Sequence, residues 1–145
     1  MLPVRIRRLD AAVPLPEYQT PGAAGFDFTA SADVEIAAGQ VALVPTGLII
    51  QVPDGHVLGI FARSSTPLKR GLMVANGVGI IDRDYCGPAD EIRIQVVNFT
   101  AKPVQVKRGD RIAQGLFLPV TQVTWTEADG DLRDGSRGGF GATGR

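Results

Sequence analysis

Cysteine and histidine are almost absent from this sequence of 145 residues, which contains only Cys86 and His56. A single cysteine excludes an internal disulfide and a cysteine-rich zinc site, and it suits a reducing compartment. A single histidine excludes a metal site built on two histidines. Net charge is missing too, because 15 lysines and arginines balance 15 aspartates and glutamates. No overall field therefore attracts nucleic acid or an anionic membrane, and any anionic ligand must be bound by local groups.

Long apolar segments are also missing. No stretch approaches the roughly 18 apolar residues that a membrane helix needs. The first ten residues, MLPVRIRRLD, lack the apolar block of a signal peptide. We therefore expect a cytoplasmic protein with neither a membrane nor a nucleic acid as its partner.

A sustained helical period is the third absence. Glycines (18) and prolines (10) separate many short apolar runs, which favours strands joined by turns over helices. The predicted strands are Val4 to Leu9, Gly25 to Thr29, Val34 to Ile36, Val41 to Val44, Leu48 to Val52, Val57 to Phe61, Val78 to Ile81, Ile92 to Asn98, Val104 to Val106, Ile112 to Leu118 and Thr121 to Trp125. This pattern predicts an all-β sandwich, jelly roll or barrel. The turn-forming residues Pro53-Asp54-Gly55 further predict a hairpin over Leu48 to Phe61.

Two segments differ from this strand pattern. Ser65 to Gly71 offers a hydroxyl N-cap, a proline in the first turn, later basic residues and a closing glycine, and it predicts one short helix. After Trp125 the apolar pattern stops. We therefore divide the chain into a β domain of residues 1–125 and a flexible C-terminal segment of residues 126–145, which cannot form a core alone.

Phosphate-binding chemistry is concentrated where a predicted strand meets the predicted helix. Arg63, Ser64 and Ser65 place a guanidinium, two hydroxyls and free backbone N–H groups together, the composition of a phosphate cradle. The alternative is an ordinary N-cap beside a solvated arginine. Taken alone, Asp27 is typical of a turn residue and Gln114 of a structural hydrogen bonder.

A second set of chemical groups lies in the stretch NGVGIIDRDYCG, which begins at Asn76. The amide of Asn76 can donate and accept hydrogen bonds, and Gly79 lets a flat ring approach the backbone. Asp82 follows a predicted strand end, where a carboxylate can activate a water molecule. The alternative is a hairpin with aspartate in its turn and Tyr85 in the core.

The glycine-rich C-terminal segment carries one further possibility. Arg137 and Phe140 lie among its glycines. Such a segment can order over a phosphorylated aromatic ligand, with the arginine on a phosphate and the phenylalanine on the ring. The alternative is a disordered terminus.

Five short segments occur in a fixed order, from about Gly25 to Thr143: AGFD, ARSS, NGVGIIDRDY, RGDRIAQ and RGGFGATG. Their order and spacing resemble the five motifs of the trimeric dUTP pyrophosphatases (dUTPases). The resemblance implies a β jelly roll with one short helix that assembles as a homotrimer with active sites shared between chains. It also implies hydrolysis of dUTP to dUMP and pyrophosphate, which limits uracil incorporation into DNA and supplies dUMP for dTMP synthesis.

The same resemblance assigns roles to individual residues. Asp82 would be the general base, activating a water molecule for in-line attack on the α-phosphorus. Asn76 and the backbone at Gly79 would bind uracil, and Tyr85 would pack under the deoxyribose and exclude ribose. The cofactor would be Mg²⁺, held by the triphosphate and by water molecules. Asp27 would support the site through an arginine or a metal-bound water.

The remaining implied residues contact the phosphates or close the site. Those that hold the phosphate chain are Arg63, Ser64, Ser65 and Gln114. Those that would close over the nucleotide from the tail of a neighbouring chain are Arg137, Gly138 and Phe140.

The sequence departs from the family pattern after the third motif. Members commonly continue Tyr-X-Gly-Glu-Ile, whereas here Pro88-Ala89-Asp90 stands between Gly87 and Glu91. We interpret this as a short insertion that leaves the chemistry intact but changes the local turn and bears on the contacts between subunits. Two other functions are open: a dCTP deaminase, which is similar in fold and would need Glu91 as its catalytic glutamate, and a non-catalytic nucleotide-binding jelly roll.

Overall fold

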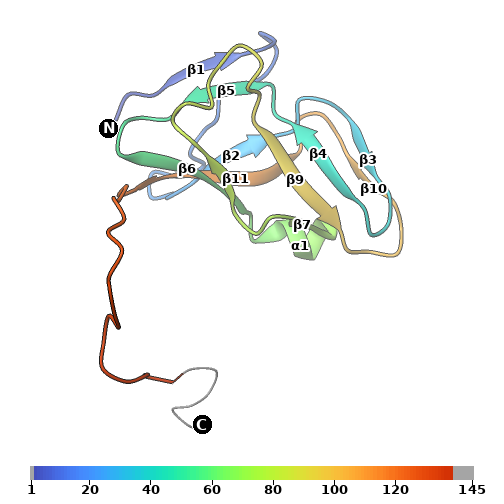
Figure 1. Cartoon of the computed structure of the whole chain (residues 1–145). Coiled ribbons are helices and arrows are strands. Elements are labelled where there is room, and N and C mark those ends of the chain that lie inside the picture. Colours follow the sequence, from blue (N-terminus) through green and yellow to red (C-terminus); the bar gives the residue numbers. More distant parts are fainter. Residues whose placement is uncertain (1, 139–145) are drawn as a thin grey trace.

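The computed structural model describes residues 2–138 and is almost entirely β (Figure 1). Its elements are β1 (Arg5–Arg8), β2 (Phe26–Thr29), β3 (Val34–Ile36), β4 (Val41–Pro45), β5 (Leu48–Gln51), β6 (His56–Ala62), α1 (Ser65–Arg70), β7 (Leu72–Val74), β8 (Gly79–Ile81), β9 (Arg93–Asn98), β10 (Val104–Val106) and β11 (Arg111–Pro119). The predicted all-β jelly roll with one short helix is confirmed. That helix is the only one in the described part, and its six residues are too few to cross a bilayer.

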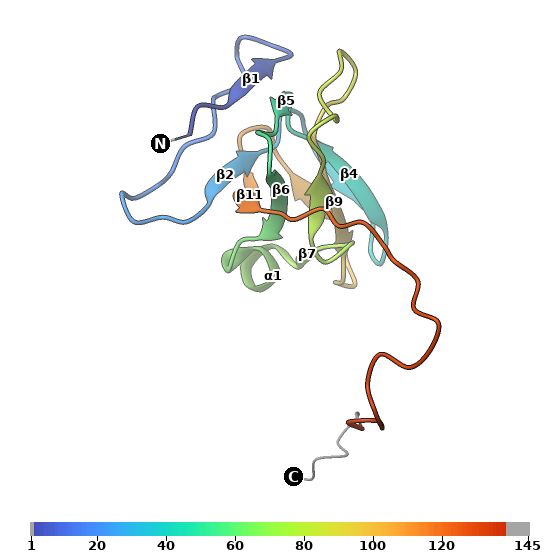
Figure 2. The same cartoon turned by 60° about the vertical axis from the view of Figure 1, so that its left-hand side comes forward.

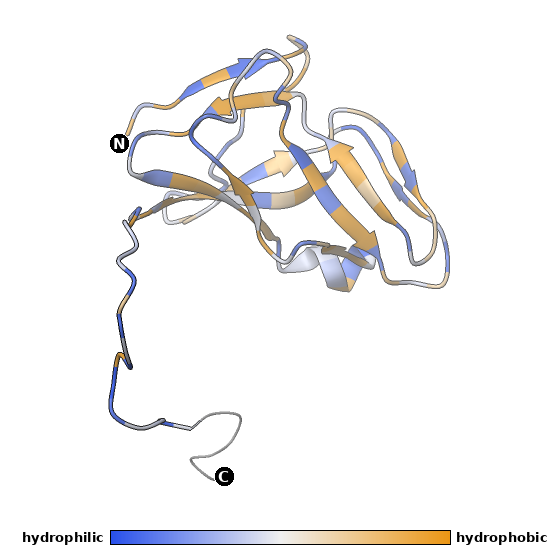
Figure 3. Ribbon diagram, viewed as in Figure 1, coloured by the Kyte–Doolittle hydropathy of each residue, from blue (hydrophilic) through white to orange (hydrophobic). Residues whose placement is uncertain are grey.

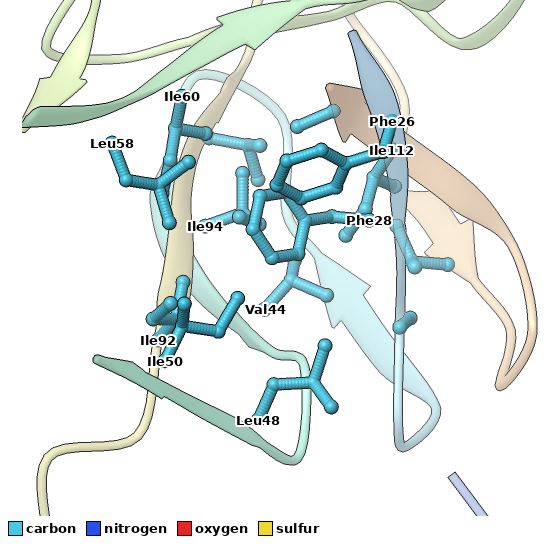
Figure 4. Packing of buried hydrophobic residues seen from close by; sticks show 14 of the residues in the cluster. Phe26, Phe28, Val44, Leu48, Ile50, Leu58, Ile60, Ile92, Ile94 and Ile112 are labelled. Carbon is cyan, nitrogen blue, oxygen red and sulfur yellow. The ribbon is translucent and has the colours of Figure 1, made fainter. Parts of the chain in front are cut away.

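The strands form antiparallel sheets that position the candidate site. The largest sheet has the order β2-β11-β6-β8, and a second has the order β4-β9-β7. Two further pairs are β1-β5 and β3-β10. Alternate residues of each sheet face a common core, as on β2, where Phe26 and Phe28 are buried while Asp27 is half-buried. The two rings meet edge to face with centroids 5.3 Å apart, inside the cluster drawn in Figure 4.

The short helix forms where the sequence predicts it, but its start differs. Ser64 is the N-cap residue and makes no side-chain capping hydrogen bond, so its hydroxyl remains exposed. Gly71 closes the helix in the left-handed conformation, with φ of 65°, and its N–H donates to the carbonyl of Pro67 at 3.1 Å. The Thr66 hydroxyl donates to the buried carbonyl of Ile112 at 3.1 Å, which attaches the helix to β11.

Two expectations about strands are wrong, and one strand was not predicted. Leu48 to Phe61 is not a hairpin: the turn at Pro53-Asp54-Gly55 forms, but β5 pairs with β1 while β6 pairs with β11 and β8. Thr121 to Trp125 is not a strand, because these exposed residues have no pairing partner within residues 2–138. The three-residue strand β7 was not predicted, and it pairs with β9 directly after the helix.

The chain beyond β11 leaves the body of the molecule. Residues 120–138 have no regular structure and lead away from the sheets in both views (Figures 1 and 2). They are exposed, including Trp125 at 90%. The jelly roll of the described residues is therefore complete at Pro119.

Several apolar residues of the β4-β9-β7 sheet are exposed, and Figure 3 colours the strands by hydropathy. Val41 lies opposite Val97, which in turn lies opposite Met73 on the other side. Val41 is 53% exposed and Met73 48%. Leu43 on β4 and Ile80 on β8 are also exposed. Apolar residues gathered in this way mark a surface suited to covering by another protein chain.

Candidate functional site

A carboxylate between two arginines organises one end of the β2-β11-β6-β8 sheet. Asp27 Oδ1 accepts a hydrogen bond from Arg63 Nε at 2.7 Å, and Asp27 Oδ2 accepts one from Arg111 Nη1 at 3.2 Å. Only 11% of the Asp27 side chain is exposed. Because both guanidinium groups carry further N–H donors, the carboxylate orients them while leaving hydrogen-bonding capacity for an anion.

Gln114 lies beside this pair because of a β-bulge. Arg111 is opposite Thr29 and Gln114 is opposite Asp27, with the register shifting between Arg111 and Ala113. Residues three apart in a regular strand point to opposite faces, whereas the extra residue brings Arg111 and Gln114 to the face that bears Asp27. The Gln114 amide donates to the carbonyl of Ala62 at 2.9 Å, which fixes its orientation.

Two hydroxyls complete this end of the sheet. Ser65 Oγ accepts a hydrogen bond from Arg63 Nη1 at 3.4 Å, and the exposed Ser64 precedes it. Gly25 is close to the same group, since a Cβ there would lie 3.0 Å from Gln114 Oε1. We call this set the arginine cluster; its members are Asp27, Arg63, Ser64, Ser65, Arg111 and Gln114. The structure thus brings together every residue that the sequence analysis assigned to the phosphate chain.

The turn between β10 and β11 is fastened to the helix next to this cluster. Arg70 Nη1 contacts Asp110 Oδ2 at 2.7 Å, and the Lys107 N–H donates to the same oxygen at 2.9 Å. The hydrogen bond from Arg70, together with that from the Lys107 backbone, holds the pKa of Asp110 below its ordinary value despite partial burial. This connection fixes the start of β11, from which Arg111 reaches Asp27.

Asp82 and Tyr85 line a separate hollow with a volume of about 440 Å³. Its lining residues are Leu43, Ile80, Ile81, Asp82, Tyr85, Ala89, Glu91 and Arg93. The Asp82 side chain is exposed, and no residue within 2–138 donates a hydrogen bond to its carboxylate. The Tyr85 ring is also accessible, with the residue 41% exposed and its hydroxyl donating to the Glu91 carbonyl at 3.2 Å. Tyr85 is therefore not a core residue.

Asn76 lies in the tight turn that connects β7 to β8. The Gly77 N–H donates to the Val74 carbonyl at 3.1 Å, and Asn76 is exposed. The turn does not join a two-stranded ladder, because β7 pairs with β9 and β8 with β6. Gly79 is opposite Ile60, where a Cβ would lie 3.1 Å from the isoleucine Cβ.

The arginine cluster and the hollow lie toward opposite ends of β6. Ile81, directly before Asp82, is opposite Leu58, whereas Arg63 directly follows the last residue of β6. Leu58 and Arg63 are five residues apart, roughly 17 Å at about 3.3 Å per residue in a strand. A single chain therefore does not bring Asp82 to the residues assigned to the phosphates.

The tail residues lie apart from both groups. Arg137 and Gly138 are exposed in the segment that leads away from the sheets. The Gly138 N–H donates only to Ser136 Oγ, at 3.1 Å, among the described residues. Phe140 lies outside the residues that the structure describes.

Sequence reasoning left out several residues of these groups. Arg111 stands in the RGDRIAQ motif, yet only the β-bulge reveals that it contacts Asp27. Leu43 and Ile80 line the hollow, and their signal in the sequence was no more than alternation within short strands. Within residues 2–138, no cluster of three histidine, cysteine, aspartate or glutamate side chains is arranged to hold a metal ion.

Comparisons with known proteins point to one family. A family model described as dUTPase matches residues 11–144. A deoxyuridine 5'-triphosphate nucleotidohydrolase from Desulfitobacterium hafniense is 50% identical over 142 residues, covering 94% of this chain and 91% of the relative. The protein of the same name from Methylocella silvestris is 41% identical, covering 99% and 92% respectively.

Solved structures of the same kind are also similar. The dUTPase from Streptococcus mutans is 37% identical and superposes with a TM-score of 0.77 over 84% of this chain and 98% of that one. The Staphylococcus bacteriophage 80alpha dUTPase with dUPNHPP is 20% identical, with a TM-score of 0.87 over 100% of both chains. The dUTPase of phage phi11 of S. aureus, 19% identical with a TM-score of 0.78 over 89% and 98%, coordinates a structural Mg(II) ion. The chain described here belongs to the dUTPase family.

Proposed function

We propose that the chain hydrolyses dUTP to dUMP and pyrophosphate. The observation that carries this proposal is that the structure holds two complementary groups of residues. Cationic and hydroxyl groups lie together in the arginine cluster, whereas the Asp82 carboxylate lines a hollow beside the accessible Tyr85 ring. The relatives named as deoxyuridine 5'-triphosphate nucleotidohydrolases support the same activity. The single unpaired cysteine makes a reducing compartment, the cytoplasm, the expected location.

Asp82 acts as the general base in this proposal. Its carboxylate takes a proton from a water molecule, whose oxygen attacks the α-phosphorus in line with the bond to the bridging oxygen. That bond breaks, and pyrophosphate leaves with the electron pair. An exposed carboxylate without hydrogen-bond donors around it is free to orient a water molecule, which the environment of Asp82 allows.

The phosphate chain is bound by the arginine cluster. Arg63 supplies charge-assisted hydrogen bonds, and Ser64, Ser65 and Gln114 supply neutral donors around it. Asp27 contacts no phosphate in this account. Both of its oxygens already accept from arginines, so its role is to orient Arg63 and Arg111.

The base and the sugar are assigned to the segment from Asn76 to Tyr85, which runs antiparallel to β6, with Gly79 opposite Ile60 and Ile81 opposite Leu58. The exposed amide of Asn76 and the backbone near Gly79 would pair with the edge of uracil, and the accessible Tyr85 ring would lie under the deoxyribose. A site that pairs with a base edge rejects a base lacking the matching groups, because its own polar groups would then be left unpaired.

Mg²⁺ fits this chain as an ion carried by the substrate. Asp27 is occupied by two arginines, and no three-carboxylate cluster exists in the described part of the chain. Triphosphate oxygens and water molecules are the ligands that Mg²⁺ prefers when a protein offers few. When bound there, the ion would neutralise charge on the phosphates.

Assembly as a homotrimer would unite the two separated groups. A chain whose Asp82 and Arg63 lie toward opposite ends of one strand can form a complete site only with a neighbour. The apolar outer face of the β4-β9-β7 sheet, with Val41, Leu43 and Met73, offers the surface for such contacts. The segment 126–145, with Arg137, Gly138 and Phe140, would close over the nucleotide from a neighbouring chain.

The deaminase alternative is disfavoured by the contacts of Glu91. Its Oε1 accepts the Gly47 N–H at 2.8 Å and its Oε2 accepts from Arg93 Nε at 3.1 Å, so the carboxylate is used in holding the start of β9. A carboxylate held in this way is poorly placed to exchange protons with a substrate.

The direct test measures products from separate substrates. Purified protein is incubated with dUTP, UTP, dTTP or dCTP, each with and without Mg²⁺. We expect pyrophosphate from dUTP at a far higher kcat/KM than from the others, and a large loss without the ion. Ammonia from dCTP would support the deaminase instead, and binding without any product would support a non-catalytic module.

A further inference from the structure

We propose that the inserted loop Gly87–Asp90 positions Tyr85 and forms one wall of the sugar site, so that it sets the preference for deoxyribose over ribose. This inference rests on the proposed function. The loop borders the hollow that contains Asp82, since Ala89 is one of the residues that line it.

The loop is closed by a reciprocal pair of hydrogen bonds. The Gly87 N–H donates to Asp90 Oδ2 at 2.7 Å, and the Asp90 N–H donates to the Gly87 carbonyl at 3.2 Å. A Cβ at Gly87 would lie 2.8 Å from the same carboxylate oxygen, so only glycine fits without displacing it. We call this pair of bonds the Gly87–Asp90 clip.

The clip acts on Tyr85 from both sides. Gly87 follows Tyr85 by two residues, and Glu91, whose carbonyl accepts the Tyr85 hydroxyl at 3.2 Å, directly follows Asp90. The far end is anchored as well, because the Glu91 carboxylate accepts the Gly47 N–H. Closing the loop therefore sets the distance between the backbone of Tyr85 and the acceptor of its hydroxyl.

The insertion also reaches the hollow itself. Ala89 lines it together with Asp82 and Tyr85. An added methyl group at the wall of a sugar site narrows the space available to a 2′-hydroxyl. A wall rejects a larger ligand only if it does not yield, and the clip is what prevents Tyr85 and Ala89 from moving apart.

The first test removes or keeps the clip. Asp90→Ala deletes the acceptor, whereas Asp90→Asn retains an oxygen that can accept the Gly87 N–H. We expect kcat/KM for dUTP to fall about tenfold in Asp90→Ala, as for loss of one charged hydrogen bond. The value for UTP should change far less, so that the dUTP-to-UTP ratio falls, and Asp90→Asn should restore most of it.

Asp33 serves as a matched control, because its carboxylate also accepts a backbone N–H. Asp33 Oδ1 accepts the backbone N–H of Arg108 at 2.8 Å at an exposed site, so Asp33→Asn tests the general effect of changing such a carboxylate. It should leave the ratio unchanged. If kcat/KM in Asp90→Ala falls equally for dUTP and UTP, so that their ratio is unchanged, the proposal is wrong, since a merely structural role affects both substrates alike.

A second variant does not depend on the clip. Ala89 is exposed, so Ala89→Leu should fold normally while filling the hollow. We expect KM for dUTP to rise about tenfold with kcat largely kept; an unchanged KM would count against the wall. Affinities for dUMP and UMP are measured in parallel for every variant. If the wild-type protein releases no pyrophosphate but binds dUMP more tightly than UMP, and Asp90→Ala removes that difference, the proposed function is wrong and the inference holds. If the wild-type protein binds dUMP and UMP equally well, the inference is wrong.

Discussion

The arginine cluster and the hollow lie toward opposite ends of β6 and differ in how complete they are. In the arginine cluster every charged group has a partner: Asp27 lies between Arg63 and Arg111, and Gln114 is held by the Ala62 carbonyl. In the hollow Asp82 has no hydrogen-bond donor among residues 2–138. Under the proposed function, this difference teaches that one chain would preorganise phosphate binding alone, whereas Asp82 would gain its partners only with substrate and a neighbouring chain.

Asp82→Asn should have the largest effect, because it changes the carboxylate that lines the hollow. We expect kcat to fall about 10³-fold, because the amide cannot accept the proton of the attacking water. Binding of dUTP and thermal stability should persist, since the side chain is exposed. The matched control is Asp84→Asn, also exposed and two residues away, which should keep kcat within about twofold. Retained turnover in Asp82→Asn would remove its assigned role.

Deleting residues 136–145 tests whether hydrolysis needs the C-terminal segment in addition to the arginine cluster and the hollow. The jelly roll is complete at Pro119, so the truncated protein should keep its melting temperature and its assembly. We expect kcat to fall about 10²-fold, because the nucleotide is no longer shielded and aligned. Steady-state kinetics measure kcat, and sedimentation on the same sample measures the assembly. Unchanged turnover would contradict the assignment of this segment as a lid.

Asp27→Asn should weaken the arginine cluster, in which the Asp27 carboxylate orients Arg63 and Arg111. Loss of the charge between two arginines should raise KM for dUTP about tenfold and lower the free energy of unfolding by about 1–3 kcal/mol. Asp10→Asn serves as control, because Asp10 pairs with Arg108 at 3.5 Å at an exposed site and should change neither quantity appreciably. A KM unaffected by Asp27→Asn would mean that Arg63 needs no orienting partner.

Asp110→Asn should have the smallest effect, a loss of stability near neutral pH that disappears in acid. The pKa of Asp110 is lowered by Arg70 and the Lys107 N–H, so its contribution is present above its ordinary pKa of about 3.9 and is lost as pH falls through the lowered value. We expect the variant to be less stable by about 0.5–1 kcal/mol at pH 7. In urea titrations the difference from wild type should shrink below about pH 4. A constant difference would show that the charge of Asp110 is not responsible.

Local patterns predicted the elements better than their pairing. The helix was predicted correctly because Pro67 in its first turn and the closing Gly71 act within the segment itself, although the predicted hydroxyl cap makes no hydrogen bond. The supposed hairpin over Leu48 to Phe61 failed because turn chemistry is local, whereas the partners β1 and β11 are chosen by distant core packing. The three-residue β7 was too short to show an alternation.

The same limit applies to the candidate site. The motifs located Arg63 and Asp82 in the sequence, but their placement toward opposite ends of β6 follows from strand register, which no motif states. The part played by Arg111 depends on one β-bulge in β11. Residues 121–125 alternate like a strand, and within the described chain they have nothing to pair with.

Mixing two inactive variants tests most directly whether the site needs two chains. Ser64→Ala impairs the arginine cluster and Asp82→Asn impairs the hollow, and both positions are exposed, so each variant should fold. After equal amounts are unfolded and refolded together, about a quarter of all sites would draw both intact residues from different chains. We predict that dUTP hydrolysis then rises far above the sum of the two variants alone. Activity no greater than that sum would contradict a site shared between chains.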